Sequence, residues 1–98
     1  MSRYVKGRRL EYRVRDLFQN KEYVVVRAAQ SKPVDLVCLK NGRALLVECK
    51  TEKSLLSKAR KEELLNLAKT AGASLILARR KGRKIEMVEL ETGEPLII

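Results

Sequence analysis

The segment 34–50, VDLVCLKNGRALLVECK, constrains the fold of this chain more than any other stretch. It contains two runs rich in Val and Leu, which are typical of β-strands, on either side of Asn41 and Gly42. Asn-Gly is a favoured two-residue hairpin turn because both residues tolerate a positive φ. The segment therefore predicts two antiparallel strands, over residues 34–39 and 43–49, in one fixed register.

Three charged side chains interrupt this apolar hairpin. The turn pairs residue 35 with residue 48, so Asp35 and Glu48 should be cross-strand neighbours, and Lys50 should share the strand face of Glu48. Like charges opposite each other destabilise a sheet, and a divalent cation removes that repulsion. Mg²⁺ commonly takes one or two protein carboxylates and keeps waters or phosphate oxygens. We therefore predict a Mg²⁺ site, with Mn²⁺ as a substitute, at Asp35, Glu48 and the backbone carbonyl of Cys49.

This predicted site has the groups needed for phosphodiester hydrolysis. A cation there would lower the pKa of a bound water and polarise a phosphoryl oxygen. Lys50 would orient the attacking water or stabilise the transition state. Glu11, at the border of a helical apolar stripe, would bind a second ion or an outer-shell water. The alternative interpretation is a solvated sheet edge with an i, i+2 charge pair, and a helical glutamate that only aids solubility.

The rest of the chain supplies helices and further strands around the hairpin. Apolar residues at i, i+4, i+7 and i+8 predict a helix over residues 6–20, and a second helical pattern begins after Ser54 or Ser57 and ends at Gly72. Strands are predicted over 23–29, 74–80 and 84–90. The order α-β-β-β-α-β-β predicts a small mixed sheet flanked by helices, of the α/β class, in a single domain over residues 1–98.

The composition narrows the possible chemistry. The chain has no histidine, which excludes His-ligated zinc and Ser-His-Asp catalysis. Its two cysteines, Cys38 and Cys49, lie in apolar runs and are expected to pack as small hydrophobic residues in a reducing compartment, with a disulfide between neighbouring strands as the alternative. Neither a signal peptide nor a membrane span is apparent, so we expect a cytoplasmic protein of an archaeal, viral or phage host cell, with no membrane partner.

The net charge of +10, at a pI of about 10.0, predicts a polyanionic partner, with nucleic acid favoured. The alternative is a solvated surface of the kind common in heat-adapted proteins. The basic residues concentrate in the first 21 residues and in RRKGRK at 79–84. The predicted DNA contacts are Lys6, Arg8, Arg9, Arg13, Arg27, Lys32, Lys53, Arg80, Lys81 and Arg83.

The first 53 residues carry a resemblance to a known family. They contain an opening KG before a helix glutamate, a V-V-R strand, a serine loop, V-D-L-V, and E-x-K after a glycine turn. This pattern resembles the archaeal-type Holliday junction resolvases of the PD-(D/E)xK nuclease superfamily. The resemblance implies a restriction-endonuclease-like fold in a single nuclease domain. The family commonly has Arg directly after the helix glutamate, where this chain has Tyr12.

The resemblance implies specific roles for residues of this chain. It implies that Glu11, Asp35, Glu48 and Lys50 form the metal and catalytic set. It also implies that Ser31 lies on a loop near the scissile phosphate and that Arg27 contacts the DNA backbone. The family members are Mg²⁺-dependent homodimers that place paired nicks in four-way junction DNA, and no small-molecule cofactor beyond the metal is implied.

Apolar residues outside the periodic faces suggest where a second subunit would bind. These residues are Leu55, Leu56, Leu96, Ile97 and Ile98, and the alternative is that they cap the core. Two alternatives to junction resolution also stay open. The chain would be a related nuclease acting on flaps, ends or duplex DNA, or a junction-binding protein that does not cut.

Overall fold

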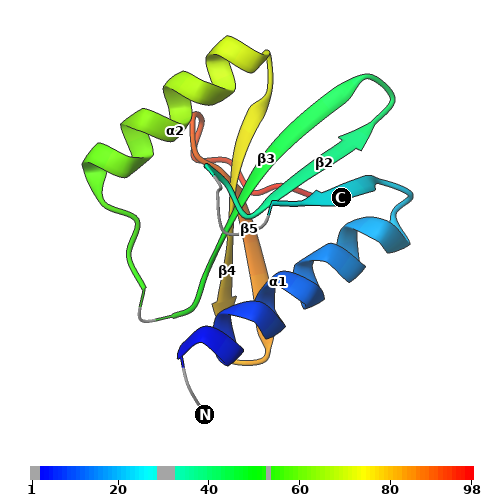
Figure 1. The fold of residues 1–98 in the computed structure, drawn as a ribbon, viewed down its shortest axis with the longest axis vertical. Coiled ribbons are helices and arrows are strands. Elements are labelled where there is room, and N and C mark those ends of the chain that lie inside the picture. Colours follow the sequence, from blue (N-terminus) through cyan, green and yellow to red (C-terminus); the bar gives the residue numbers. More distant parts are fainter. Residues whose placement is uncertain (1–2, 29–32, 53) are drawn as a thin grey trace.

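A computed structural model describes residues 3–28, 33–52 and 54–98 of the chain. The order of helices and strands is the predicted α-β-β-β-α-β-β, as Figure 1 shows. The elements are α1 (Arg3–Asn20), β1 (Val24–Arg27), β2 (Leu36–Lys40), β3 (Arg43–Lys50), α2 (Lys58–Ala71), β4 (Ser74–Lys81) and β5 (Lys84–Glu89).

The strands form one mixed sheet in the order β1-β2-β3-β4-β5. All neighbouring strands are antiparallel except β3 and β4. These two are parallel because α2 returns the chain to the end of the sheet at which β3 began. In the β2–β3 hairpin Leu36 pairs with Val47 and Cys38 pairs with Leu45. This is the register that the Asn-Gly turn predicts, so the expected fold class and register are confirmed.

Local sequence signals fix the ends of these elements. Asn41 and Gly42 have φ values of 51° and 75°, as a tight hairpin of this hand requires. The hydroxyl of Ser57 accepts a hydrogen bond from the backbone N–H of Arg60, so Ser57, of the two predicted serines, caps α2. Gly72 ends α2 in the left-handed conformation, at φ 67°.

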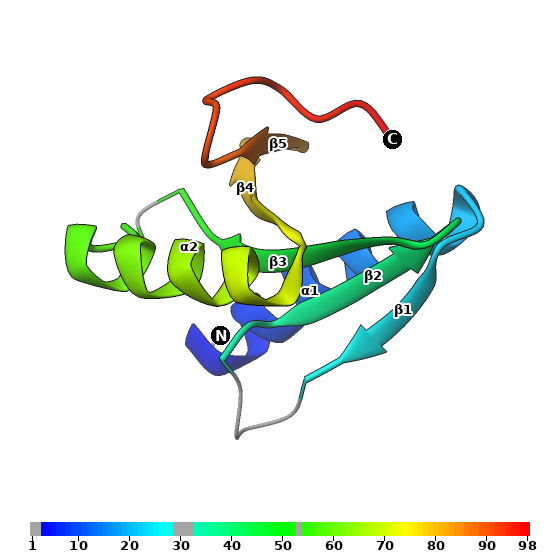
Figure 2. The same cartoon turned by 90° about the horizontal axis from the view of Figure 1, so that it is seen from above.

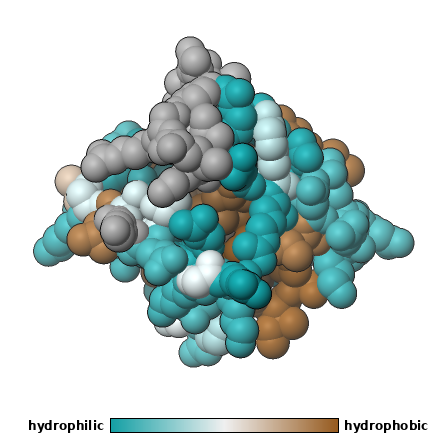
Figure 3. Space-filling view, turned by 90° about the horizontal axis from the view of Figure 1, so that it is seen from below, coloured by the Kyte–Doolittle hydropathy of each residue, from teal (hydrophilic) through white to brown (hydrophobic). Residues whose placement is uncertain are grey.

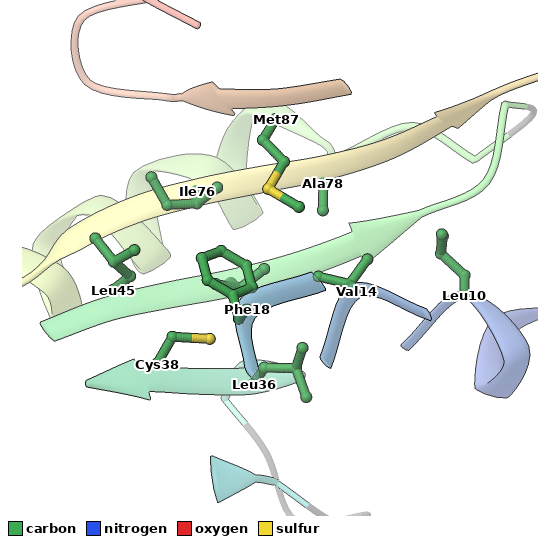
Figure 4. Close-up of a cluster of buried hydrophobic side chains, with 10 residues drawn as sticks. Leu10, Val14, Phe18, Leu36, Cys38, Leu45, Ile76, Ala78 and Met87 are labelled. Atoms are coloured by element: carbon green, nitrogen blue, oxygen red, sulfur yellow. The ribbon is translucent and has the colours of Figure 1, made fainter. Parts of the chain in front are cut away.

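The larger core lies between α1 and the sheet. Figure 4 shows Leu10, Val14 and Phe18 of α1 pointing at strand residues such as Leu36 and Leu45. Most of these side chains are fully buried, and each contributes roughly 1.5–3 kcal/mol relative to an exposed position. We call this cluster the α1-side core. Its other buried members are Cys38, Val47, Ile76, Ala78 and Met87.

A smaller core lies on the other face of the sheet, where α2 packs. Leu46 of β3 joins Leu64 and Ala68 of α2, together with Val34 and Leu75, in what we call the α2-side core. Successive residues of β3 thus alternate between the two cores, because strand side chains point to opposite faces. The helices therefore lie on different sides of β3, which Figure 2 shows from a second direction.

The tail after β5 packs more closely than the sequence indicates. Pro95 forms a bridge with Val88, and the backbone N–H of Leu96 donates to the carbonyl of Met87 at 2.8 Å. Leu96 and Ile98 pack against the α1-side core, so for these two the core-capping alternative holds.

Two further expectations concern the cysteines and the membrane. Cys38 and Cys49 are free thiols, which removes the alternative of a disulfide. No helix in the described parts of the chain is long and apolar enough to span a bilayer.

Candidate active site

Asp35 and Glu48 lie side by side at the open end of the β2–β3 hairpin, tied by reciprocal hydrogen bonds. The backbone N–H of Asp35 donates to Oε1 of Glu48 at 3.1 Å. The backbone N–H of Cys49 donates to Oδ2 of Asp35 at 2.8 Å. Each carboxylate is thus held by a main-chain group of the other strand. Asp35 and Glu48 are neighbours across the hairpin, as predicted, although β2 begins at Leu36 and not at residue 34, so the two lie just beyond the last pair, Leu36 with Val47.

Both carboxylates are nearly excluded from solvent, at 3% exposed for Asp35 and 4% for Glu48. Burying charge is costly unless it is hydrogen-bonded and compensated, and two like charges add repulsion. A fold that only needed stability would place apolar residues here, as it does at Cys38 and Leu45 further along the same hairpin. The burial therefore contradicts the alternative of a solvated sheet edge for Glu48 and is typical of charged residues at functional sites.

Lys50 follows Glu48 by two positions in β3, so strand alternation places both side chains on the same face. It is half-buried and pairs in the parallel register with Arg79 of β4. Lys50 is the last residue of β3 and lies on the strand face of Glu48. This is the position that the sequence predicts for a lysine that acts on water or phosphate.

Glu11 approaches this end of the sheet from α1. Its Oε2 lies 3.2 Å from Nε of Arg27 on β1, and the guanidinium of Arg27 also lies over the ring of Tyr12, at 4.8 Å from its centroid. Arg27 pairs with Leu36, the residue after Asp35. The ion pair is therefore a near neighbour of the carboxylate pair. The sequence did not predict this contact between Glu11 and Arg27.

The pKa of the Cys49 thiol reflects the negative charge of this region. Burial raises its pKa, and the nearby carboxylates of Asp35, Glu11 and Glu48 raise that pKa further. Burial alone raises the pKa of Cys38, further along the hairpin, to about 12. Glu11 of α1, Asp35 just before β2 and Glu48 of β3 thus lie within electrostatic range of one half-buried thiol. The predicted acidic residues are gathered at one end of the sheet.

The groups that would hold an ion fit Mg²⁺ better than a closed structural site. Within residues 3–28, 33–52 and 54–98 no three side chains of the His, Cys, Asp or Glu type lie together as ligands of one ion. Asp35 and Glu48, which are joined by hydrogen bonds to each other's strand segment, offer two carboxylates, and Mg²⁺ commonly takes one or two from protein. Glu11, whose carboxylate is paired with Arg27, and the carbonyl of Cys49 stay predicted ligands.

Two arginines that are not among the predicted site residues hold the loops around this end of the hairpin. Arg60 of α2 donates to the carbonyl of Pro33, just before β2. Arg79 of β4 donates to the carbonyls of Thr51 at 3.4 Å and Ser54 at 2.8 Å, just after β3. The entry to one strand and the exit from the other are thereby fixed. Only the folded path of the loops reveals these contacts.

The predicted basic residues form two groups that meet across the fold. Arg13 of α1 donates to the backbone carbonyl of Arg83 in the β4–β5 turn, although the two are 70 residues apart. Arg9, Lys81 and Arg83 are exposed, and Lys81 pairs with Glu86 at 3.2 Å. Hydrophilic residues cover most of the face at this end of the molecule, with smaller hydrophobic areas between them (Figure 3). Arg8 and Arg80 are half-buried beside the exposed group.

Some predicted site residues lie outside what the structure describes. These are Ser31, Lys32 and Lys53, together with the side chain of Lys6. Their assignments stay predictions.

The fold and its buried carboxylate pair define a small α/β domain built around an acidic hairpin. Over residues 2–95 the chain matches the family described as archaeal Holliday junction resolvase (Hjc), and it belongs to this family. It is similar to the crossover junction endodeoxyribonuclease Hjc of Methanocaldococcus jannaschii, with 33% identity over 79 residues. That match covers 78% of this chain and 59% of the relative, so the chain spans about three fifths of the relative's length.

The fold is similar to that of a solved structure, the Hjc of Archaeoglobus fulgidus, described as a Holliday junction resolvase. The TM-score is 0.77 at 24% sequence identity, covering 88% of this chain and 74% of that one. At this identity the likeness concerns the fold. It supports the helix–sheet arrangement on which the position of the site depends.

Proposed function

We propose that the chain is a metal-dependent endonuclease that resolves four-way (Holliday) junctions inside the cell. The observation that carries this proposal is the buried pair of Asp35 and Glu48, held by main-chain hydrogen bonds beside Lys50. Membership of the archaeal resolvase family supports the choice of a branched DNA substrate. The net charge of +10 supports a polyanionic one.

Asp35 and Glu48 would hold Mg²⁺, or Mn²⁺ in its place. When bound, the cation would supply a water of lowered pKa and offset charge on the phosphate. The hydrogen bonds from the backbone of the opposite strand orient both carboxylates before any ion arrives. Lys50 would orient the attacking water or donate to a phosphoryl oxygen, and Ser31 would lie near the scissile phosphate.

The basic residues of α1 and of the β4–β5 turn would bind the DNA backbone beyond the cut. The chain has no Trp, and aromatic residues make up only 4% of it, so base stacking is a poor candidate for the main mode of recognition. Charge and shape would then select the junction. Affinity should fall steeply with salt, because each neutralised phosphate releases counterions.

A four-way junction needs two cuts, and we propose a homodimer that supplies two related active sites. Of the apolar residues that suggest an interface, Leu55 and Ile97 are strongly exposed, at 82% and 92%. Val24 and Val26 on the edge strand β1 are also exposed, at 64% and 50%, and form a second candidate surface. Sedimentation equilibrium of Leu55→Ser/Ile97→Ser and Val24→Ser/Val26→Ser variants would show which surface joins the subunits.

The test of the proposed activity compares substrates and metal states. End-labelled four-way junction, flap, nicked duplex and linear duplex are incubated with Mg²⁺ or with chelator, using the wild type, Asp35→Asn and Glu48→Gln. Paired nicks in the junction alone, dependent on Mg²⁺ and absent in both variants, support the proposal. Cleavage of every substrate supports the related nuclease. Tight junction binding without cutting, unchanged by Asp35→Asn, leaves a binding protein.

A further inference from the structure

The side chain of Arg27 contacts both a carboxylate and an aromatic ring at the border of the candidate active site. Its Nε lies 3.2 Å from Glu11 Oε2, and its guanidinium lies over Tyr12. The side chain of Arg27 is 37% exposed and that of Glu11 is 18% exposed. Among the residues that the structure describes, the two terminal nitrogens of Arg27 donate no hydrogen bond to the protein. Part of the guanidinium fork therefore faces solvent.

The position of this ion pair links it to the carboxylates of Asp35 and Glu48. The residue after Arg27, Ala28, donates its backbone N–H to the carbonyl of Asp35 at 3.0 Å. Arg27 itself pairs across the strands with Leu36, the residue directly after Asp35. A positive charge on Arg27 therefore lies within electrostatic range of the proposed cation site, and it neutralises one of the three nearby carboxylates.

We propose that Arg27 is a positioning residue that couples DNA binding to cation binding. Without DNA, its guanidinium neutralises Glu11 and weakens the binding of a divalent cation by Asp35 and Glu48. A DNA phosphate competes for the same guanidinium and draws its positive charge away from Glu11 and from the cation. This inference rests on the proposed function, since it needs both a cation and a phosphate at this site.

The chemistry of the groups favours such an exchange. Guanidinium binds phosphate through two parallel hydrogen bonds, and these are stronger than a single contact to a carboxylate. Partly exposed ion pairs contribute little stability, so the pair of Arg27 with Glu11 opposes the exchange only weakly. Linkage then requires phosphate and cation to raise each other's affinity by the same factor.

The first test measures Mn²⁺ binding without DNA, by water-proton relaxation, in the wild type and in Arg27→Gln, Arg27→Lys, Glu11→Gln and Asp35→Asn. We expect Arg27→Gln to bind Mn²⁺ tighter, by up to about tenfold for a unit charge removed near a divalent ion in a partly solvated site. Arg27→Lys should stay near the wild type because it keeps the charge. In a Glu11→Gln background the gain from Arg27→Gln should shrink, because the carboxylate that it frees is gone.

The second test measures the coupling itself. Junction affinity is measured in chelator and in Ca²⁺, and the factor by which Ca²⁺ raises it should be smaller in Arg27→Gln than in the wild type. Circular dichroism confirms that each variant is folded, and a damaged fold would weaken Mn²⁺ binding instead of tightening it.

The outcomes separate this inference from the proposed function. Mn²⁺ binding that Asp35→Asn removes, but that Arg27→Gln leaves unchanged or weakens, would overturn the role of Arg27 alone. An absence of any Mn²⁺ binding that depends on Asp35, with or without junction DNA, would overturn the proposed function and this inference together.

Discussion

The two ends of the β2–β3 hairpin share one register but bury opposite kinds of side chain. Near the turn, Cys38 pairs with Leu45, and both are fully buried in the α1-side core. At the open end, Asp35 and Glu48 are almost equally buried and carry charge. The same ladder thus supports a closed end that stabilises the fold and an open end whose burial opposes stability. The second arrangement is expected where function, and not packing, selects the residues.

The difference between the apolar and the acidic end of the hairpin shows how a small domain holds an acidic site in place. The carboxylates are fixed by main-chain N–H groups of the opposite strand, and these groups keep their positions as long as the apolar part of the ladder stays paired. The apolar end therefore supplies the rigidity and the acidic end the chemistry. Substitutions at the two ends should separate these contributions.

The largest expected effect is the loss of cleavage in Asp35→Asn. Removal of a metal-binding carboxylate should lower the single-turnover rate by about 10³-fold or more, because stabilisation of the transition state is lost. The free energy of unfolding without metal should stay the same or rise, since Asn removes the repulsion with Glu48 and keeps an oxygen for the N–H of Cys49. Junction cleavage and urea unfolding measure the two quantities on one sample.

Two results would contradict the view that the acidic end serves function and not stability. One is full cleavage by Asp35→Asn. The other is a loss of several kcal/mol in its unfolding free energy in chelator, which would mean that the carboxylate stabilises the fold.

Leu45→Ala, unlike Asp35→Asn, should lower the stability of the fold and leave metal binding nearly unchanged. Leu45 is fully buried in the α1-side core, so its truncation should lower the free energy of unfolding by about 2–5 kcal/mol. At a temperature where the variant is still folded, the affinity for Mn²⁺ should stay within a few-fold of the wild type. Urea unfolding and Mn²⁺ titration check this. Greatly weakened Mn²⁺ binding by the folded variant would show that the two ends are not separable.

Removal of the metal should lower the stability of the folded protein through the acidic end of the hairpin alone. The expected loss is smaller than that caused by Leu45→Ala. A ligand that binds the folded state alone stabilises it by about 1.4 kcal/mol at ten times its dissociation constant. Mg²⁺ should therefore raise the melting temperature of the wild type and of Leu45→Ala, and chelator should reverse the rise. Asp35→Asn should show no such rise. Thermal unfolding across a Mg²⁺ series measures this, and an equal rise in Asp35→Asn would place the ion elsewhere.

The apolar end and the register of the hairpin could be predicted from the sequence for a physical reason. Both depend on local patterns, since strand alternation and the Asn-Gly turn involve neighbours in the chain. The pairing of Asp35 with Glu48 follows directly from that register. In α1 the predicted stripe is only partly right: Leu10, Val14 and Phe18 pack into the core as their spacing predicts, whereas Leu17, at the i+7 position, is 38% exposed.

What could not be predicted depends on contacts between distant segments. The ties from Arg60 to Pro33 and from Arg79 to Ser54 follow from the paths of two loops, and loop paths have no periodic signal. The pair of Glu11 with Arg27 depends on how α1 rotates against β1. The bridge of Pro95 to Val88 was missed because a short apolar tail has no strand pattern of its own.

The smallest expected effect concerns the turn that sets the register of both ends. Gly42 has φ 75°, and nothing lies within 4 Å of a Cβ added there, so Gly42→Ala would cost conformational strain without a steric clash. We expect a loss of about 1 kcal/mol in the free energy of unfolding. Asn41→Gly is the matched control, because glycine also adopts the φ of 51° at that position and should change stability less. Cleavage of the junction by Gly42→Ala should be unchanged, since five further positions of each strand segment lie between the turn and the carboxylates. A drop in cleavage with little loss of stability would mean that the alanine shifts the register, because a slip of one residue would turn Glu48 to the other face of the sheet.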